Sequence, residues 1–172
     1  SSAASDVYKR QLSDFAKEHE ILVAFDEMQS GFGRTGKLFG YMHYDIEPDI
    51  LCCGKGASSG LPLAIVLGSS EIMDLPEIGS MSSTHSANPL VCAAGMANLE
   101  SLFEDGLIKN SEQLGIVFHD YLKKIKKRFP GQLNWIEGKG LLAALIFKDE
   151  AGNPLTSLCD SIAELCMQRG LL

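Results

Sequence analysis

Polar and glycine residues crowd into one short stretch, Phe25 to Gly36, with the sequence FDEMQSGFGRTG. The stretch holds two acids, a glutamine, an arginine and three glycines, and it directly follows the apolar run ILVA. A buried core has no use for this density of polar groups, and a solvated surface does not require so many glycines. The composition therefore indicates chemistry rather than packing or solvation.

Two further candidates follow at regular spacing. Lys55 lies 29 residues after Asp26, and Thr84 lies another 29 residues on. Taken singly, these residues have ordinary explanations, because an aspartate at a strand end is most often a turn or cap residue. The segment GKGASSG also fails as a phosphate-binding P-loop, since no glycine precedes Gly54 at the required spacing and Gly56 follows the lysine where Ser or Thr is needed.

Short apolar runs predict the strands that position these side chains, over residues 21–25, 49–53 and 63–69. Continuous apolar strands with glycine-rich ends are typical of a sheet covered on both faces, so we expect an α/β fold with a mostly parallel sheet. Ligands of such sheets bind beyond the carboxyl ends of the strands. Asp26 and Lys55 both lie at such ends.

The rest of the chain predicts helices, a strand pair and a domain boundary. The first ten residues fit no expected element, and a change in local character near residues 104–110 separates a domain at 1–105 from a second at 106–172. Helices are expected over 11–19, from Pro89 with Asn88 as its N-cap, over 110–129 and near 156–169, and strands over 132–138 and 141–147.

Composition excludes several function classes. Apolar residues make up 45% of the 172 residues and the net charge is −7, which indicates a globular protein and argues against nucleic acid or a membrane as partner. No apolar run approaches the roughly 20 residues that span a bilayer. Five cysteines without a CxxC pair and four scattered histidines predict reduced thiols in a cytoplasmic protein and no metal site.

Three segments read together are far more specific: DEMQSGFGRTG, PDILCCGKGASSGLPL and STHSANPLVCAAGMA. They resemble the signature of the class III aminotransferases, fold-type-I pyridoxal-phosphate enzymes that include the ω-aminotransferases. The resemblance covers residues 11–172 and implies an aspartate-aminotransferase-like α/β fold. Residues 1–105 would form the C-terminal part of the large cofactor-binding domain, and residues 106–172 an incomplete α+β small domain.

The resemblance implies pyridoxal 5′-phosphate as the cofactor and gives each candidate a role. Lys55 is expected to form the Schiff base and, once freed, to move a proton between substrate and cofactor carbons. Asp26 is expected to keep the pyridine nitrogen protonated, and Gln29 to hydrogen-bond the phenolic oxygen. Met28, where the family has Val or Ile, is expected to cover one face of the ring. Thr84 is expected to reach the partner subunit's cofactor phosphate, which implies a homodimer with shared active sites.

Two other residues of the same segment, Glu27 and Arg34, are expected to have structural rather than catalytic roles. The side chain of Glu27 should point to the opposite face from that of Asp26, because successive residues of a strand alternate. Arg34 is expected to brace its loop by pairing with an acid rather than to bind substrate.

The activity implied by the resemblance is transfer of an amino group between an ω-amine or amino acid and an α-keto acid. An aminomutase or racemase of the same fold and a truncated, non-catalytic remnant remain alternatives. The family's phosphate loop and its substrate-binding arginine lie outside these residues, so we expect a fragment that is a poor catalyst alone. The sequence identifies neither the amine nor the keto acid.

Overall fold

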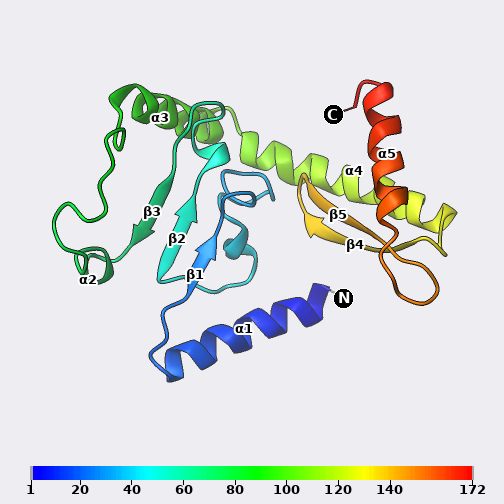
Figure 1. Cartoon of the computed structure of the whole chain (residues 1–172), viewed down its shortest axis with the longest axis horizontal. Helices are drawn as coiled ribbons and strands as arrows, with labels where there is room; N and C mark the ends of the chain where they lie inside the picture. Colours follow the sequence, from blue (N-terminus) through cyan, green and yellow to red (C-terminus); the bar gives the residue numbers. More distant parts are fainter. Residues whose placement is uncertain (1, 172) are drawn as a thin grey trace.

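The computed structural model describes residues 2–171 and has two small sheets joined by two long helices (Figure 1). One sheet contains β1 (Ala24–Asp26), β2 (Ile50–Cys53) and β3 (Ile65–Gly68), and the other contains β4 (Leu133–Lys139) and β5 (Leu142–Phe147). The helices are α1 (Ser2–Glu18), α2 (Ser70–Met73), α3 (Pro89–Glu104), α4 (Leu107–Arg128) and α5 (Thr156–Gln168), with 3₁₀ turns η1 (Gly40–His43) and η2 (Lys55–Ala57). Figure 1 shows α3 and α4 running in succession from the first sheet to the β4–β5 hairpin.

Strand pairing in the first sheet is mixed. β1 runs parallel to β2, with Asp26 opposite Cys52, whereas β3 runs antiparallel to β2. The expected parallel arrangement therefore holds for the first pair only. The connection from β2 to β3 spans only residues 54–64, which is too short for a parallel crossover that typically needs a dozen or more residues.

Burial of this sheet is uneven. Leu51 and Cys53, which share one face of β2, are buried, but the consecutive residues Val66 and Leu67 of β3, which point to opposite faces, are 45% and 49% exposed. The expectation of a sheet covered on both faces therefore does not hold at β3 within the described residues. The first strand is also shorter than expected, since residues before Ala24 connect to β2 through loop contacts such as the Val23 amide donating to Asp49 Oδ2 at 2.7 Å.

Most helix ends lie close to the positions predicted from the sequence. Asn88 caps α3, its side chain accepting a hydrogen bond from the Leu90 amide at 3.0 Å, as predicted. The expectation that the first ten residues fit no element is wrong, because α1 begins at Ser2 and runs through them. Residue 1 lies outside the described residues. None of the helices described over residues 2–171 is both long and apolar enough to cross a membrane.

A break between α3 and α4 coincides with the predicted domain boundary. α3 ends at Glu104, and Gly106 adopts a left-handed conformation (φ 66°) before α4 begins, three residues earlier than expected. Glycine takes this conformation without a steric penalty, so it allows the chain to change direction there. The division into two domains at 105/106 stays a prediction.

Close backbone contacts join the second sheet to the glycine-rich loop. A Cβ on Gly115 of α4 would lie 2.5 Å from Gly140 Cα in the β4–β5 turn, and Gly140 in turn lies directly against the Thr35 backbone. The Leu141 amide also donates to the Arg34 carbonyl at 2.9 Å. The loop that carries the candidate site residues is therefore fixed to the hairpin and to α4.

Leu133 should be a main stabilising residue of the second sheet, because its side chain is 0% exposed. We expect Leu133→Ala to lower the free energy of unfolding by about 2–5 kcal/mol through lost burial and the cavity it leaves. Leu75→Ala, at a position 76% exposed, should change it by less than about 0.5 kcal/mol. Urea unfolding followed by circular dichroism measures both, and equal effects would contradict this assignment of the core.

Candidate active site at the carboxyl edge of the first sheet

The predicted site residues gather where β1 and β2 end. Asp26 is the last residue of β1, and Lys55 opens the turn η2 just after β2. Lys55 Nζ donates a hydrogen bond to Gln29 Oε1 at 3.1 Å, although the two residues are 26 positions apart in the sequence. An amine, an amide and a carboxylate therefore share one edge of the sheet.

The carboxylate of Asp26 is exposed and partly engaged by its own loop. Asp26 Oδ1 accepts a hydrogen bond from the Met28 amide at 2.9 Å, which shapes the chain as it leaves β1. The other oxygen, Oδ2, has no hydrogen-bond partner among the described side chains and backbone. One face of the carboxylate is therefore free to accept a proton or a hydrogen bond from a ligand.

Glu27 is buried, unlike the exposed Asp26 before it, and has the structural contacts that were expected of it. Its carboxylate is 3% exposed and accepts hydrogen bonds from the Gly40 amide at 2.8 Å, the Tyr41 amide at 2.7 Å and the Ser30 hydroxyl at 2.5 Å. A buried charge is stable only when its oxygens are satisfied in this way. Glu27 thus closes the loop of residues 27–41 into a rigid unit.

Asn98 of α3 is a site residue that the sequence analysis missed. Its side-chain amide donates to the carbonyls of Gly56 at 2.8 Å and Ala57 at 3.2 Å, and Ser59 donates to its oxygen. These bonds anchor the turn that begins at Lys55. The only sign in the sequence is one amide in the largely apolar helical run GMANLESL, and its partners are some 40 residues away.

Two separate cavities border the site. One of about 840 Å³ is lined by Lys55, Arg34, the residues 59–61 and others of the β2–β3 connection. The other, of about 410 Å³, lies among α1, β1, η1 and the hairpin, and Asp26 and Glu27 line it. The structure thus joins Lys55 to Gln29 directly but does not place Asp26 and Lys55 in one of these cavities.

Arg34 does not behave as expected. It is exposed, lines the cavity beside Lys55 and has no acidic partner among residues 7–171. The predicted pairing with an acid is therefore not found within residues 7–171. The loop is braced at this point by the backbone, where the Arg34 carbonyl accepts from Leu141, so the guanidinium is left facing solvent.

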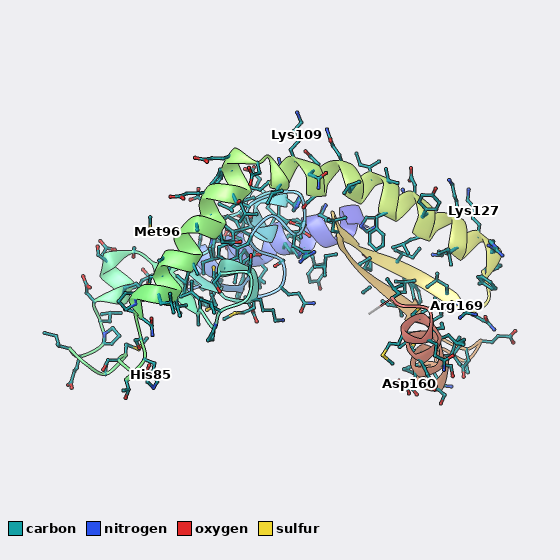
Figure 2. All side chains as sticks on the ribbon, turned by 90° about the horizontal axis from the view of Figure 1, so that it is seen from above. His85, Met96, Lys109, Lys127, Asp160 and Arg169 are labelled. Carbon is teal, nitrogen blue, oxygen red and sulfur yellow. The ribbon has the colours of Figure 1, made fainter. Side chains whose placement is uncertain are left out.

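Thr84 lies apart from the other predicted residues. It is exposed in the loop between α2 and α3 and lines neither of the two cavities. Figure 2 shows the adjacent His85 at one extreme of the molecule, with Lys127, Asp160 and Arg169 at the other. The structure therefore shows an outward-facing Thr84, and its role across a subunit interface stays a prediction.

Removing the Glu27 carboxylate should loosen the whole loop. In Glu27→Ala two backbone amides lose their buried acceptor, and each such loss costs about 1–3 kcal/mol of unfolding free energy. Glu27→Gln keeps one acceptor oxygen and should therefore lose less. Chemical denaturation measures both against the exposed control Glu104→Ala, and a Glu27→Ala variant as stable as the control would contradict the bracing role.

Cys53 should resist alkylation. Burial raises the pKa of its thiol to about 11, and the nearby Glu27 carboxylate adds to the rise. Because the thiolate is the reactive form, Cys53 should remain unmodified by iodoacetamide near pH 8, roughly the range in which ordinary thiols begin to ionise. The exposed Cys159 is the internal control, and mass spectrometry of timed digests measures both. Equal rates in the folded chain would contradict the prediction.

Comparison with known proteins identifies the family. The family model for class-III aminotransferases matches residues 1–172. A probable 4-aminobutyrate aminotransferase of Bacillus subtilis is 36% identical over 167 residues, covering 96% of this chain and 38% of the relative. An alanine/serine racemase of Pyrococcus horikoshii is 37% identical, covering 95% of this chain and 34% of its own length.

Solved structures agree with the sequence matches. The taurine:2-oxoglutarate aminotransferase of Bifidobacterium kashiwanohense, solved with PLP and glutamate, superposes with a TM-score of 0.87 at 25% identity, covering 95% of this chain and 39% of that one. The predicted α/β fold class is thereby confirmed. The chain spans between about a third and two fifths of the length of these relatives. On sequence and structure together, the chain belongs to the class-III aminotransferase family.

Proposed function

We propose that the protein containing this chain transfers an amino group between an ω-amine or amino acid and an α-keto acid, using pyridoxal 5′-phosphate held at Lys55. The observation that carries the proposal is the hydrogen bond from Lys55 Nζ to Gln29 Oε1 at the sheet edge where Asp26 also ends its strand. Membership of the family supports it, as does the PLP bound in the taurine aminotransferase structure.

The groups present fit the cofactor. A primary amine reacts with an aldehyde, an amide hydrogen-bonds a phenolic oxygen, and a carboxylate with one free oxygen holds a proton on a pyridine nitrogen. Lys55, Gln29 and Asp26 supply these three groups. Lys55 and Gln29 are both exposed, so a ligand can reach them without unfolding the chain.

When bound, the cofactor supplies an electron sink for bonds at the carbon that carries the amine. Each residue of the chain then has a distinct task. Lys55 holds the cofactor and, when released, accepts a proton at Nζ and returns it. Asp26 keeps a proton on the ring nitrogen through its free oxygen, and Gln29 orients both the Lys55 amine and the phenolic oxygen. Met28, which follows Asp26 and Glu27 in the loop, is proposed to cover one ring face.

The proposal also includes an oligomeric state and a cellular compartment. We infer a homodimer in which Thr84, exposed in the loop between α2 and α3, contacts the partner's cofactor phosphate. Five cysteines that are all free suit a reducing compartment, and we therefore assign the cytoplasm.

A racemase of the same fold is the second candidate, and the Pyrococcus relative is the observation that favours it. Both reactions need the same lysine and aspartate, so the described residues do not separate them. Incubation with one amino-acid enantiomer and 2-oxoglutarate does separate them. A transaminase produces a new keto acid, whereas a racemase produces the other enantiomer without it.

Borohydride trapping tests the cofactor site directly. After incubation with pyridoxal phosphate and reduction, we expect the label on Lys55 at least roughly tenfold above that on the exposed Lys123, because a positioned amine reacts at a higher effective concentration. Peptide mass spectrometry locates the label. Lys55→Arg should abolish the main labelled peptide, and Lys123→Arg should not. Label spread evenly over the lysines would overturn the proposal.

A further inference from the structure

The backbone at Lys55 is held in an unusual conformation. Its φ is 43°, in the left-handed region that residues other than glycine rarely adopt. Such a residue keeps its conformation only when its surroundings impose it, at a cost on the order of 1–3 kcal/mol. The residues on both sides of Lys55 are glycines, Gly54 and Gly56. Packing against these two positions therefore controls the backbone conformation of Lys55 and the direction of its side chain.

Met28 packs on the first of these glycines. A Cβ at Gly54 would collide with Met28 Sδ, so the thioether lies directly against the Gly54 backbone. Gly54 itself is in an extended conformation (φ −175°) that any residue adopts. The absence of a side chain there is therefore explained by the Met28 contact rather than by backbone conformation.

Phe32 packs on the second glycine. A Cβ at Gly56 would lie 3.1 Å from Phe32 Cβ and 3.6 Å from the ring carbon Cδ2. Phe32 is also left-handed (φ 53°), and its ring meets Phe39 edge to face at a centroid distance of 5.6 Å. The contact with Phe39 restricts the Phe32 ring, and Phe32 meets the Gly56 position through both its Cβ and its ring.

We propose that Met28 and Phe32 form a clamp on Gly54 and Gly56 that fixes the Lys55 backbone and so positions its amine. Gln29, which binds that amine, lies between the two clamp residues on the same loop. One loop thus holds the lysine at three points: the glycine before it, the glycine after it and its Nζ. Phe32 is a positioning residue, and Met28 positions Lys55 in addition to the ring contact proposed for it above. The catalytic consequence of the clamp rests on that proposed function.

Amine acetylation tests the clamp without any cofactor. In the wild-type chain the Lys55 amine is held against Gln29 and should react more slowly with N-hydroxysuccinimide acetate than Lys123 does. Phe32→Ala keeps Cβ but removes the ring, with its contacts to the Gly56 position and to Phe39, and should raise the Lys55 rate several-fold toward the Lys123 rate. Phe32→Tyr keeps the ring and should restore the wild-type rate, whereas Phe129→Ala at the distant end of α4 should change nothing.

Pyridoxal-phosphate trapping on the same variants gives the second readout. Phe32→Ala should slow borohydride-trapped labelling of Lys55 by roughly tenfold, since misplaced reacting groups lose this much or more. Gly54→Ala should have a similar effect by displacing Met28. In the double variant Gly54→Ala/Met28→Ala the new methyl occupies space that the sulfur leaves, so labelling should recover to within about twofold of Met28→Ala alone, a non-additivity expected of residues in contact.

The outcomes separate the clamp from the proposed function and from general destabilisation. The clamp is overturned if Lys55 reacts at the same rate in Phe32→Ala and wild type, or if Phe129→Ala shifts that rate equally. It is also overturned if the Gly54 and Met28 effects simply add, or if Lys55 reactivity follows only the free energy of unfolding measured on each variant. Acetylation that responds to the clamp in a chain whose Lys55 is not preferentially trapped supports the clamp and refutes the cofactor assignment.

Discussion

The buried carboxylate of Glu27 is the interaction on which the site depends. A charge that is 3% exposed is costly unless it is fully hydrogen-bonded, and the loop of residues 27–41 curls so that two backbone amides and one hydroxyl reach it. Because the acceptor is fixed at the end of β1, the loop that closes on it is fixed as well. Met28, Gln29 and Phe32 are carried by that loop, so the position of Lys55 is set by a carboxylate that never touches it.

The same loop is braced a second time by the other sheet. Thr35 lies against Gly140 of the β4–β5 turn, which in turn lies against Gly115 of α4. These contacts are between backbones: a side chain at Gly140 would push the hairpin from the loop, and one at Gly115 would push α4 from the hairpin. The glycines after Gln29 serve two contacts: Gly31 lies against the Glu27 carbonyl, and Gly36 lies against the Glu112 backbone of α4. The close approach of the hairpin depends instead on Gly140, beside the Leu141 amide that donates to Arg34.

The features that the sequence predicts correctly are local: each depends on residues that are close together along the chain. The N-cap at Asn88, the strand ends at Asp26 and Cys53 and the structural role of Glu27 follow from residue type and periodicity. What it could not predict depends on pairing at a distance. Asn98 anchors the Lys55 turn from a helix some 40 residues away, and β3 reverses direction because of the length of one loop. The backbone at Arg34 also contacts the hairpin, through the hydrogen bond from the Leu141 amide to the Arg34 carbonyl, which its side-chain type does not indicate.

These contacts together hold the strained backbone of Lys55 in place. A flexible four-carbon side chain on a relaxed backbone would spread its amine over many positions, and ordering it would cost up to about 2 kcal/mol in rotamer entropy. Here the loop, the Asn98 amide and the two flanking glycine contacts hold the backbone in one left-handed conformation, and Gln29 holds the amine. The free energy for this order comes from burial and hydrogen bonds elsewhere in the loop. A reactive amine at a sheet edge can therefore be exposed to solvent and still be presented in a single direction.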